Sequence, residues 1–99
     1  MPLDDEQRAI IFTNTNRLVS MRDFPKTICP SEVARVFSPA ELQTLNATSW
    51  RDTMDLIREV VWELRKGGQV EILQKGQVLS NEVELEDVRG PIRVRATQK

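Results

Sequence analysis

The most regular hydrophobic pattern lies in the middle of the chain and predicts a long amphipathic helix. Its inward residues, at intervals of four, three, four and three, are Trp50, Met54, Ile57, Val61 and Leu64. Ser49 suits the N-cap of this helix, and Gly67-Gly68 ends it after a basic last turn that the helix dipole favours. We therefore expect one helix from about Ser49 to Lys66.

A first helix is predicted near the start of the chain. It opens on Asp4, Asp5 and Glu6, whose carboxylates suit the positive end of the helix dipole. It ends by Met21, because the residues that follow have the composition of a loop. Its inward face is predicted to hold Ile10, Ile11, Phe12, Leu18, Val19 and Met21.

Two short helices are predicted between these, and each begins at a proline. Pro30 suits the first turn of a helix from Ser31 to Phe37. The inward residues of that helix are predicted to be Val33, Val36 and Phe37. The next helix, from Pro39 to Leu45, begins with the capping-box pattern of Ser38 and Glu41.

Four segments are predicted to be strand-like, one before the second helix and three after the long helix. In chain order they are Lys26 to Cys29, Gln69 to Gln74, Val78 to Leu79 and Pro91 to Arg95. Only the last alternates strictly between apolar and polar residues. A turn at Lys75-Gly76-Gln77 and a polar, acidic loop from Ser80 to Gly90 separate the last three segments. We expect the strands 69–74 and 91–95 to pair antiparallel and to pack on the helices.

This order of elements predicts an α+β, mainly α, fold. It is typical of a winged helix-turn-helix with three core helices, an extra short helix and a C-terminal β-hairpin wing. A chain of 99 residues suits a single domain, here residues 1–99. With 39% apolar and 29% charged residues, the composition is that of a globular domain.

The cysteine and histidine content excludes several kinds of chemistry. One cysteine, Cys29, excludes an internal disulfide, and the absence of histidine argues against a zinc site and a Ser-His or Cys-His catalytic pair. We expect no enzyme activity, catalytic residue, metal or cofactor. Cys29 precedes a helix N-terminus, where a thiol can become reactive. A buried structural cysteine is the favoured interpretation, because Glu32 would oppose a thiolate.

The N-terminal residues are acidic and lack the apolar core of a signal peptide. No apolar run approaches the length that crosses a bilayer. We therefore expect an intracellular, cytoplasmic protein without a membrane partner, located in the nucleoid or nucleus if it binds DNA.

The sequence also resembles a family of small proteins catalogued as a domain of unknown function. The resemblance covers about Ala9 to Arg95 and is most specific in Thr27-Ile-Cys-Pro-Ser-Glu-Val-Ala-Arg35 and Arg89-Gly-Pro-Ile-Arg93. That family is generally placed in the winged-helix superfamily, so the resemblance implies this fold. It implies no activity.

The long helix carries the first group of candidate binding residues. Arg51, Arg58 and Arg65 are spaced by seven and fall on one line, with Trp62 one turn beyond Arg58. Guanidinium groups beside an aromatic ring can contact phosphates, base edges or an acidic protein surface. The alternative is a solvated helix face, with Trp62 covering the edge of the core or stacking on Arg58. The acidic residues of the adjacent line are Asp52, Asp55, Glu59 and Glu63.

The last strand carries the second group. Arg93 and Arg95 are expected on one face, with Lys75, Arg89 and Lys99 nearby, and such a face can lie along a phosphate backbone. The alternative is an edge strand kept soluble by its charge. The loop before it holds four acids, Glu82, Glu84, Glu86 and Asp87. They would repel DNA or pair with the arginines.

Two functions remain open from the sequence. The first is a nucleic-acid-associated, regulatory role through the long helix and the terminal strand. The balance of 14 basic against 15 acidic residues does not favour it. The second is a protein-interaction module, which would expose an apolar patch around Trp62, Leu56 or Val78-Leu79 and can form a homodimer.

Overall fold

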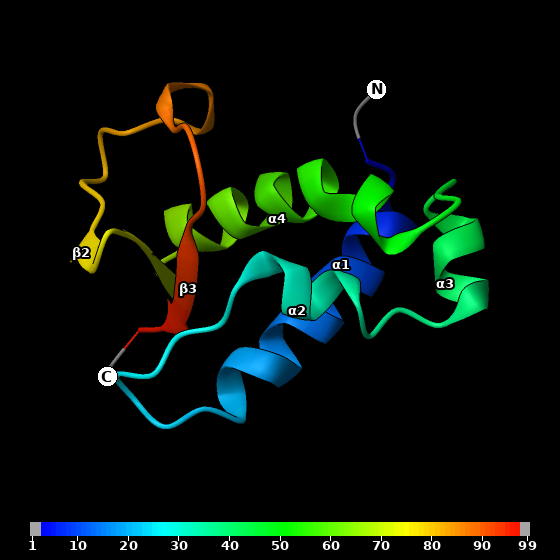
Figure 1. Cartoon of the computed structure of the whole chain (residues 1–99), viewed down its shortest axis with the longest axis horizontal. Coiled ribbons are helices and arrows are strands. Elements are labelled where there is room, and N and C mark those ends of the chain that lie inside the picture. Colours follow the sequence, from blue (N-terminus) through cyan, green and yellow to red (C-terminus); the bar gives the residue numbers. More distant parts are fainter. Residues whose placement is uncertain (1–2, 98–99) are drawn as a thin grey trace.

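Four α-helices precede a three-stranded antiparallel sheet in the computed structural model, which describes residues 3–97 (Figure 1). The helices are α1 Asp5–Ser20, α2 Pro30–Ala34, α3 Pro39–Thr44 and α4 Met54–Lys66. The strands are β1 Val70–Gln74, β2 Gln77–Val78 and β3 Arg93–Ala96. Two 3₁₀ turns, η1 Trp50–Thr53 and η2 Leu85–Asp87, bring the helical share to about half. The predicted α+β class is confirmed.

Side-chain caps set where the first and third helices begin. Asp4 accepts a hydrogen bond from the Gln7 backbone N–H at 2.8 Å, and Gln7 Oε1 accepts from the Asp4 N–H at 3.1 Å. The predicted capping box of α3 is confirmed, since Ser38 Oγ accepts from the Glu41 N–H at 3.1 Å and Glu41 Oε1 accepts from the Ser38 N–H at 2.8 Å. These reciprocal bonds satisfy N–H groups that a helix start leaves unpaired.

The second helix is shorter than predicted, and it ends at Ala34 rather than Phe37. Ser38 must be extended to cap α3 and to precede Pro39, and its ψ of 163° shows that it is. The chain therefore leaves the helix early, and Val36 is 40% exposed, although Val33 and Phe37 are buried as predicted.

The long helix also differs at its start. Its first turn is the 3₁₀ turn η1, in which the buried Thr53 donates its hydroxyl to the Trp50 carbonyl at 2.6 Å. Such local side-chain bonding competes with the α-helical ladder. The predicted stop is confirmed, because Gly67 caps α4 and Gly68 adopts a φ of +76°.

The sheet has the order β2-β1-β3. The predicted antiparallel pairing is confirmed, with Ile72 opposite Val94. Ile28 pairs with Val94 on the other side of β3 through reciprocal bonds of 2.7 and 2.8 Å. The interpretation of β3 as an edge strand is therefore wrong at Val94, because the stretch before α2 covers it.

The core lies between α4, α1 and the sheet (Figure 1). α4 buries the predicted residues Ile57, Val61 and Leu64. The prediction for α1 is wrong at Phe12 and Met21, which are 39% and 72% exposed, because the inward positions go to Ile11, Asn14, Thr15 and Val19. None of the helices in residues 3–97 is long and apolar enough to cross a membrane.

Candidate functional site

The predicted line of three arginines on the long helix does not form one surface. Arg65 is only 8% exposed, and its guanidinium stacks on Trp62 at 5.2 Å from the ring centroid. It donates to three carbonyls of the segment after β2, those of Ser80 at 3.2 Å, Asn81 at 3.4 Å and Val83 at 2.6 Å. Arg65 therefore ties the acidic loop to α4 and is not presented to a partner.

Trp62 has the same structural role. It is 4% exposed, and its indole N–H donates to the Val83 carbonyl at 3.3 Å. It covers the core edge, as one prediction had it, but it stacks with Arg65 and not Arg58. The predicted exposed apolar patch at Trp62 is wrong. Among the other candidates for that patch, Leu56 and Leu79 are partly buried and Val78 is 47% exposed.

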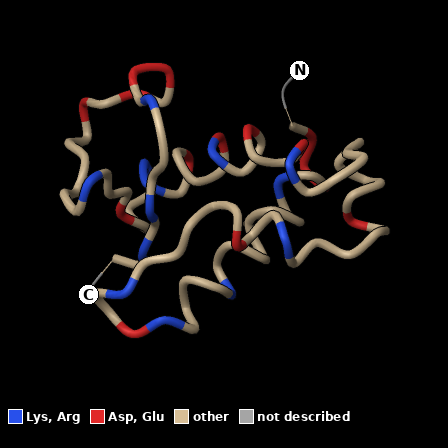
Figure 2. The backbone as a smooth tube through the Cα atoms, viewed as in Figure 1, with Lys and Arg blue, Asp and Glu red and all other residues tan. Residues whose placement is uncertain are grey.

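Arg58 lies in a groove between α4 and η2 that we call the mixed-charge groove. Its two cavities, of about 470 and 260 Å³, share Glu59, Leu85 and Glu86. The five carboxylates along it are Asp55, Glu59, Glu63, Glu84 and Glu86. The four basic side chains are Arg8, Arg58, Lys66 and Arg89. Figure 2 shows acidic and basic positions mixed along α4, and mainly acidic positions in the neighbouring loop.

The contacts in the groove are weak or exposed. Both terminal nitrogens of Arg58 lie 3.5 Å from the Gly90 carbonyl. Arg8 pairs with Glu63 at 3.1 Å, and Lys66 lies 4.0 Å from Glu84. The expected pairing of the loop acids with arginines is not found for the described residues, where the only loop carboxylate in an ion pair meets a lysine.

Arg51 is exposed and lies in η1, directly before the start of α4. Its guanidinium carbon lies 4.6 Å from the centroid of the Trp50 ring, and that of Arg35 lies 4.7 Å from the same centroid. We call these three side chains the arginine cluster. Sequence reasoning missed Arg35 and assigned Trp50 to the core, although Trp50 is half-buried. The spacing between Arg35 and Trp50 carries no periodic signal, so only the fold brings them together.

The basic residues of the terminal strand have mostly structural contacts. Arg93 and Arg95 share the outer face of β3 as predicted, opposite Leu73 and Glu71. Arg95 pairs with Glu71 at 2.9 Å and lies over the Phe24 ring at 4.7 Å. Arg93 donates to the Thr27 hydroxyl at 2.9 Å.

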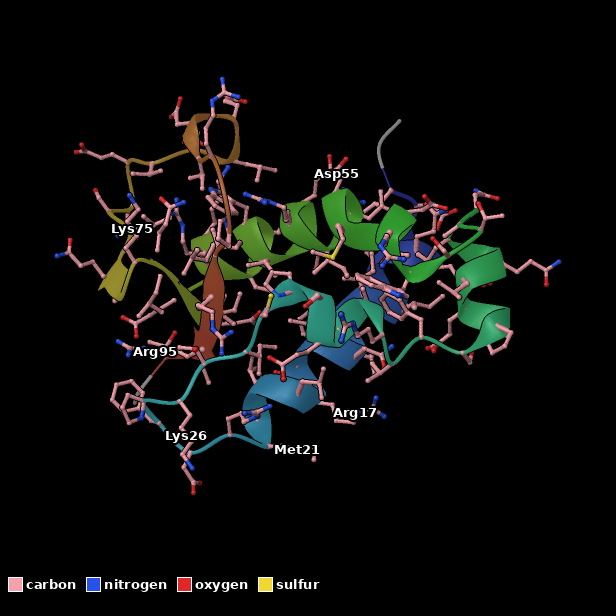
Figure 3. The ribbon with its side chains drawn as sticks, viewed as in Figure 1. Arg17, Met21, Lys26, Asp55, Lys75 and Arg95 are labelled. Carbon is pink, nitrogen blue, oxygen red and sulfur yellow. The ribbon has the colours of Figure 1, made fainter. Side chains whose placement is uncertain are left out.

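The remaining predicted neighbours of that strand are scattered. Lys75 is exposed in the β1–β2 turn, whereas Arg89 lies in the mixed-charge groove. Figure 3 shows Lys75 at the hairpin, Arg95 near the C-terminal end and Asp55 on the outer side of α4, so these charges face different surroundings. Lys99 lies outside the described residues.

Two carboxylates have shifted acidities, and both cap short helical segments. Hydrogen bonds from the Thr48 hydroxyl, the Thr48 N–H and the Ser49 N–H lower the pKa of Asp52 below its ordinary value of 3.8. The backbone bond from Ser38 lowers the pKa of Glu41 below 4.5, against the opposing effect of burial. Both carboxylates hold structure, and neither lines the mixed-charge groove.

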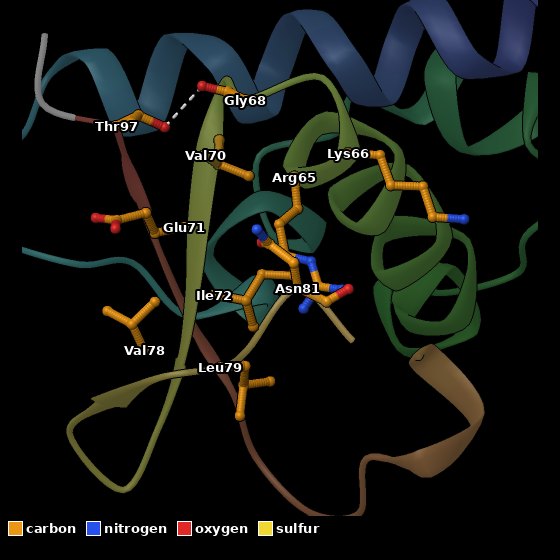
Figure 4. Close-up of a pocket in the computed structure, with 10 residues that line it drawn as sticks. All are labelled: Arg65, Lys66, Gly68, Val70, Glu71, Ile72, Val78, Leu79, Asn81 and Thr97. Carbon is orange, nitrogen blue, oxygen red and sulfur yellow. Dashed lines mark hydrogen bonds between the residues drawn. The ribbon is translucent and has the colours of Figure 1, made fainter. Parts of the chain in front are cut away.

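Other chemistry is sparse. A cavity of about 480 Å³ lies beside β1 and the end of α4, where Arg65 and Leu79 extend between them (Figure 4). Cys29 is partly rather than fully buried, and its Sγ accepts a bond from the Ser31 hydroxyl at 3.2 Å. Within residues 3–97, no group of three or more acidic, cysteine or histidine side chains is arranged to hold a metal ion.

Comparison with known proteins agrees with the resemblance to a family of unknown function. A family model described as "Protein of unknown function (DUF3253)" matches residues 8–97, close to the range expected from the sequence. A search of curated proteins gives no match. Since the matched residues are most of the chain, the protein belongs to the DUF3253 family.

Proposed function

We propose that the chain is a single winged-helix domain acting as a protein-interaction module. The order of elements supports the fold: a helix, a bridged residue, two short helices, a long helix and two strands paired antiparallel. Many domains of this architecture carry out different functions, so the site has to support the role. A non-catalytic, intracellular role is part of the proposal.

The mixed charge of the exposed face of α4 is the observation that carries the proposal. Five carboxylates and four basic groups line the groove together. A duplex laid along α4 would bring phosphates close to these carboxylates, because the 13-residue helix is only about 20 Å long. A protein can instead place a basic group opposite each carboxylate, which is how complementary interfaces gain specificity.

The test compares two double variants with the same change in charge. Glu59→Lys with Glu86→Lys reverses the shared part of the groove, whereas Glu6→Lys with Asp23→Lys reverses two exposed acids elsewhere. Nuclease-treated lysate is passed over each immobilised protein, and retained proteins are identified by mass spectrometry. We expect a discrete partner on the wild type and on the control, and its loss from the groove variant. Equal retention by all three proteins contradicts the proposal.

A homodimer is one form of such a partnership. Sedimentation at several concentrations tests it, because a dimer through the groove dissociates in the groove variant and not in the control variant. A concentration-independent monomer leaves only a different protein as the partner.

Nucleic-acid binding is the second candidate function. It is favoured by the helix-turn-helix order and by Arg51, Arg58 and Arg93, none of which is paired with a carboxylate within the described residues. It predicts salt-dependent retardation of duplex DNA that Arg58→Ala with Arg93→Ala weakens. Absence of retardation at low salt and micromolar protein rejects it.

A further inference from the structure

The arginine cluster is a concentrated positive charge with no carboxylate partner among the described residues. Arg35 comes from the C-cap of α2 and Arg51 from η1, and both guanidinium groups contact the single indole of Trp50. Both arginines are exposed. Within residues 3–97 neither has a carboxylate within ion-pair distance.

The acids closest to the cluster in sequence are already engaged. Asp52 adjoins Arg51, but its Oδ2 accepts three bonds from Thr48 and Ser49. Glu32 lies one turn before Arg35 and pairs with Arg22 at 2.7 Å. In the part of the chain that the structure describes, no direct ion pair therefore neutralises the charge of the two guanidinium groups.

Stacking on an indole prepares an arginine for binding. Contact with the ring restricts the guanidinium and leaves an N–H edge to donate, so less conformational entropy is lost when an oxyanion docks. A planar carboxylate accepts two parallel bonds from such an edge. Two neighbouring arginines can therefore hold two carboxylates of one flexible segment.

We propose that the arginine cluster binds an acidic segment of a protein partner, rich in Asp or Glu. This inference rests on the proposed protein-binding function and assigns the partner's chemistry at the start of the long helix. The carboxylates farther along α4 favour this occupant over a nucleic acid, whose charge is negative along its whole length.

A hexaglutamate peptide is the probe. Trp50 reports its binding through intrinsic fluorescence in a Trp62→Phe background, where it is the only tryptophan of the chain. At about 10 mM salt we expect a saturable change in emission that is lost near 1 M salt, where charges are strongly screened. Arg35→Ala with Arg51→Ala should weaken the binding at least about tenfold. The same two residues changed to lysine should recover only part of it, since lysine lacks the planar fork.

Lys26→Ala with Lys75→Ala is the matched control, because it removes two exposed basic side chains that lie outside both the arginine cluster and the mixed-charge groove. Unchanged binding in this variant, with the loss in the cluster variant, supports the proposal. Equal binding by wild type and cluster variant overturns it. So does tighter binding of a phosphoserine peptide or a duplex oligonucleotide than of hexaglutamate.

Failure of this inference is distinct from failure of the proposed function. Hexaglutamate binding is measured on the cluster without any partner, and partner retention is measured through the groove variants. A partner that depends on the groove but ignores the arginines of the cluster overturns the inference alone.

Discussion

Two arginine–tryptophan pairs stand at opposite ends of the long helical stretch, and they use the same contact for different purposes. Arg51 lies 4.6 Å from the Trp50 centroid, and Arg65 lies 5.2 Å from that of Trp62. Arg51 is exposed, whereas Arg65 is 8% exposed and bound to three carbonyls. The stack alone therefore does not mark a binding site. What the remaining N–H groups contact decides the role.

Two local features produce the difference. In an uninterrupted α-helix, Arg51 would lie on one line with Arg58 and Arg65. Because η1 has the tighter winding of a 3₁₀ turn, Arg51 departs from that line. At the other end, the chain between β2 and η2 returns over α4 and offers its carbonyls to Arg65. Backbone oxygens near the buried side chain need donors, and the guanidinium supplies several from a fixed geometry.

The largest expected effect is the loss of stability in Arg65→Ala. Removing this buried cation takes away bonds to Ser80, Asn81 and Val83, and we expect a cost of about 2–3 kcal/mol in the free energy of unfolding. Urea denaturation followed by circular dichroism measures it. Arg51→Ala is the control, with an expected change below about 0.5 kcal/mol. Similar losses in the two variants would remove the contrast between the pairs.

Trp62→Phe should have an intermediate effect. The substitution keeps an aromatic ring but removes the indole N–H that bonds to the Val83 carbonyl. Because Arg65 still bonds that carbonyl, we expect a cost of only about 1 kcal/mol. Faster hydrogen exchange should be confined to the segment 80–83. Unchanged exchange there would show that Arg65 holds the loop without help from Trp62.

Much of the fold follows from patterns that act over short distances. The cap at Ser38, the apolar face of α4 and the Gly67-Gly68 stop all depend on neighbouring residues, so spacing is sufficient to predict them. The α1 face was predicted less well. Asn14 occupies an inward position because its amide donates to Glu41, 27 residues away, and no local pattern contains that contact.

The candidate site was harder to predict for the same reason. Spacing by seven correctly places Arg58 and Arg65 on α4, but the burial of Arg65 depends on a loop that returns 15 to 18 residues later. Arg35 and Trp50 meet through the packing of α2 against η1. Composition did anticipate the mixed charge of the surface, since the chain has 14 basic and 15 acidic residues.

Lowering the pH should disrupt the contact between Arg51 and Trp50 before the contact between Arg65 and Trp62. The pKa of Asp52 is lowered in the folded state, so its contribution is present above its ordinary pKa of 3.8 and is lost as the pH falls through the lower folded value. Because Asp52 accepts bonds from Thr48 and Ser49 at the start of η1, its protonation should free Trp50. Emission should then change below pH 3.8 in a Trp62→Phe background, which reports Trp50, and remain constant in a Trp50→Phe background, which reports Trp62.

Asp52→Asn serves as the control for that titration, because it removes the titrating group with little change in shape. In this variant the acid-induced change in Trp50 emission should largely disappear. A change of the same size in wild type and variant would assign the transition to another carboxylate.

The smallest expected effect is the coupling within the exposed pair itself. A double-mutant cycle of Arg51→Ala and Trp50→Leu measures the interaction energy directly, and an exposed cation–π contact should give about 0.5 kcal/mol. The parallel cycle of Arg65→Ala and Trp62→Leu should give more, because both side chains there also bond the Val83 carbonyl. If the exposed pair coupled as strongly as the buried one, Arg51 would be a structural residue. Its exposure would then no longer argue for a partner.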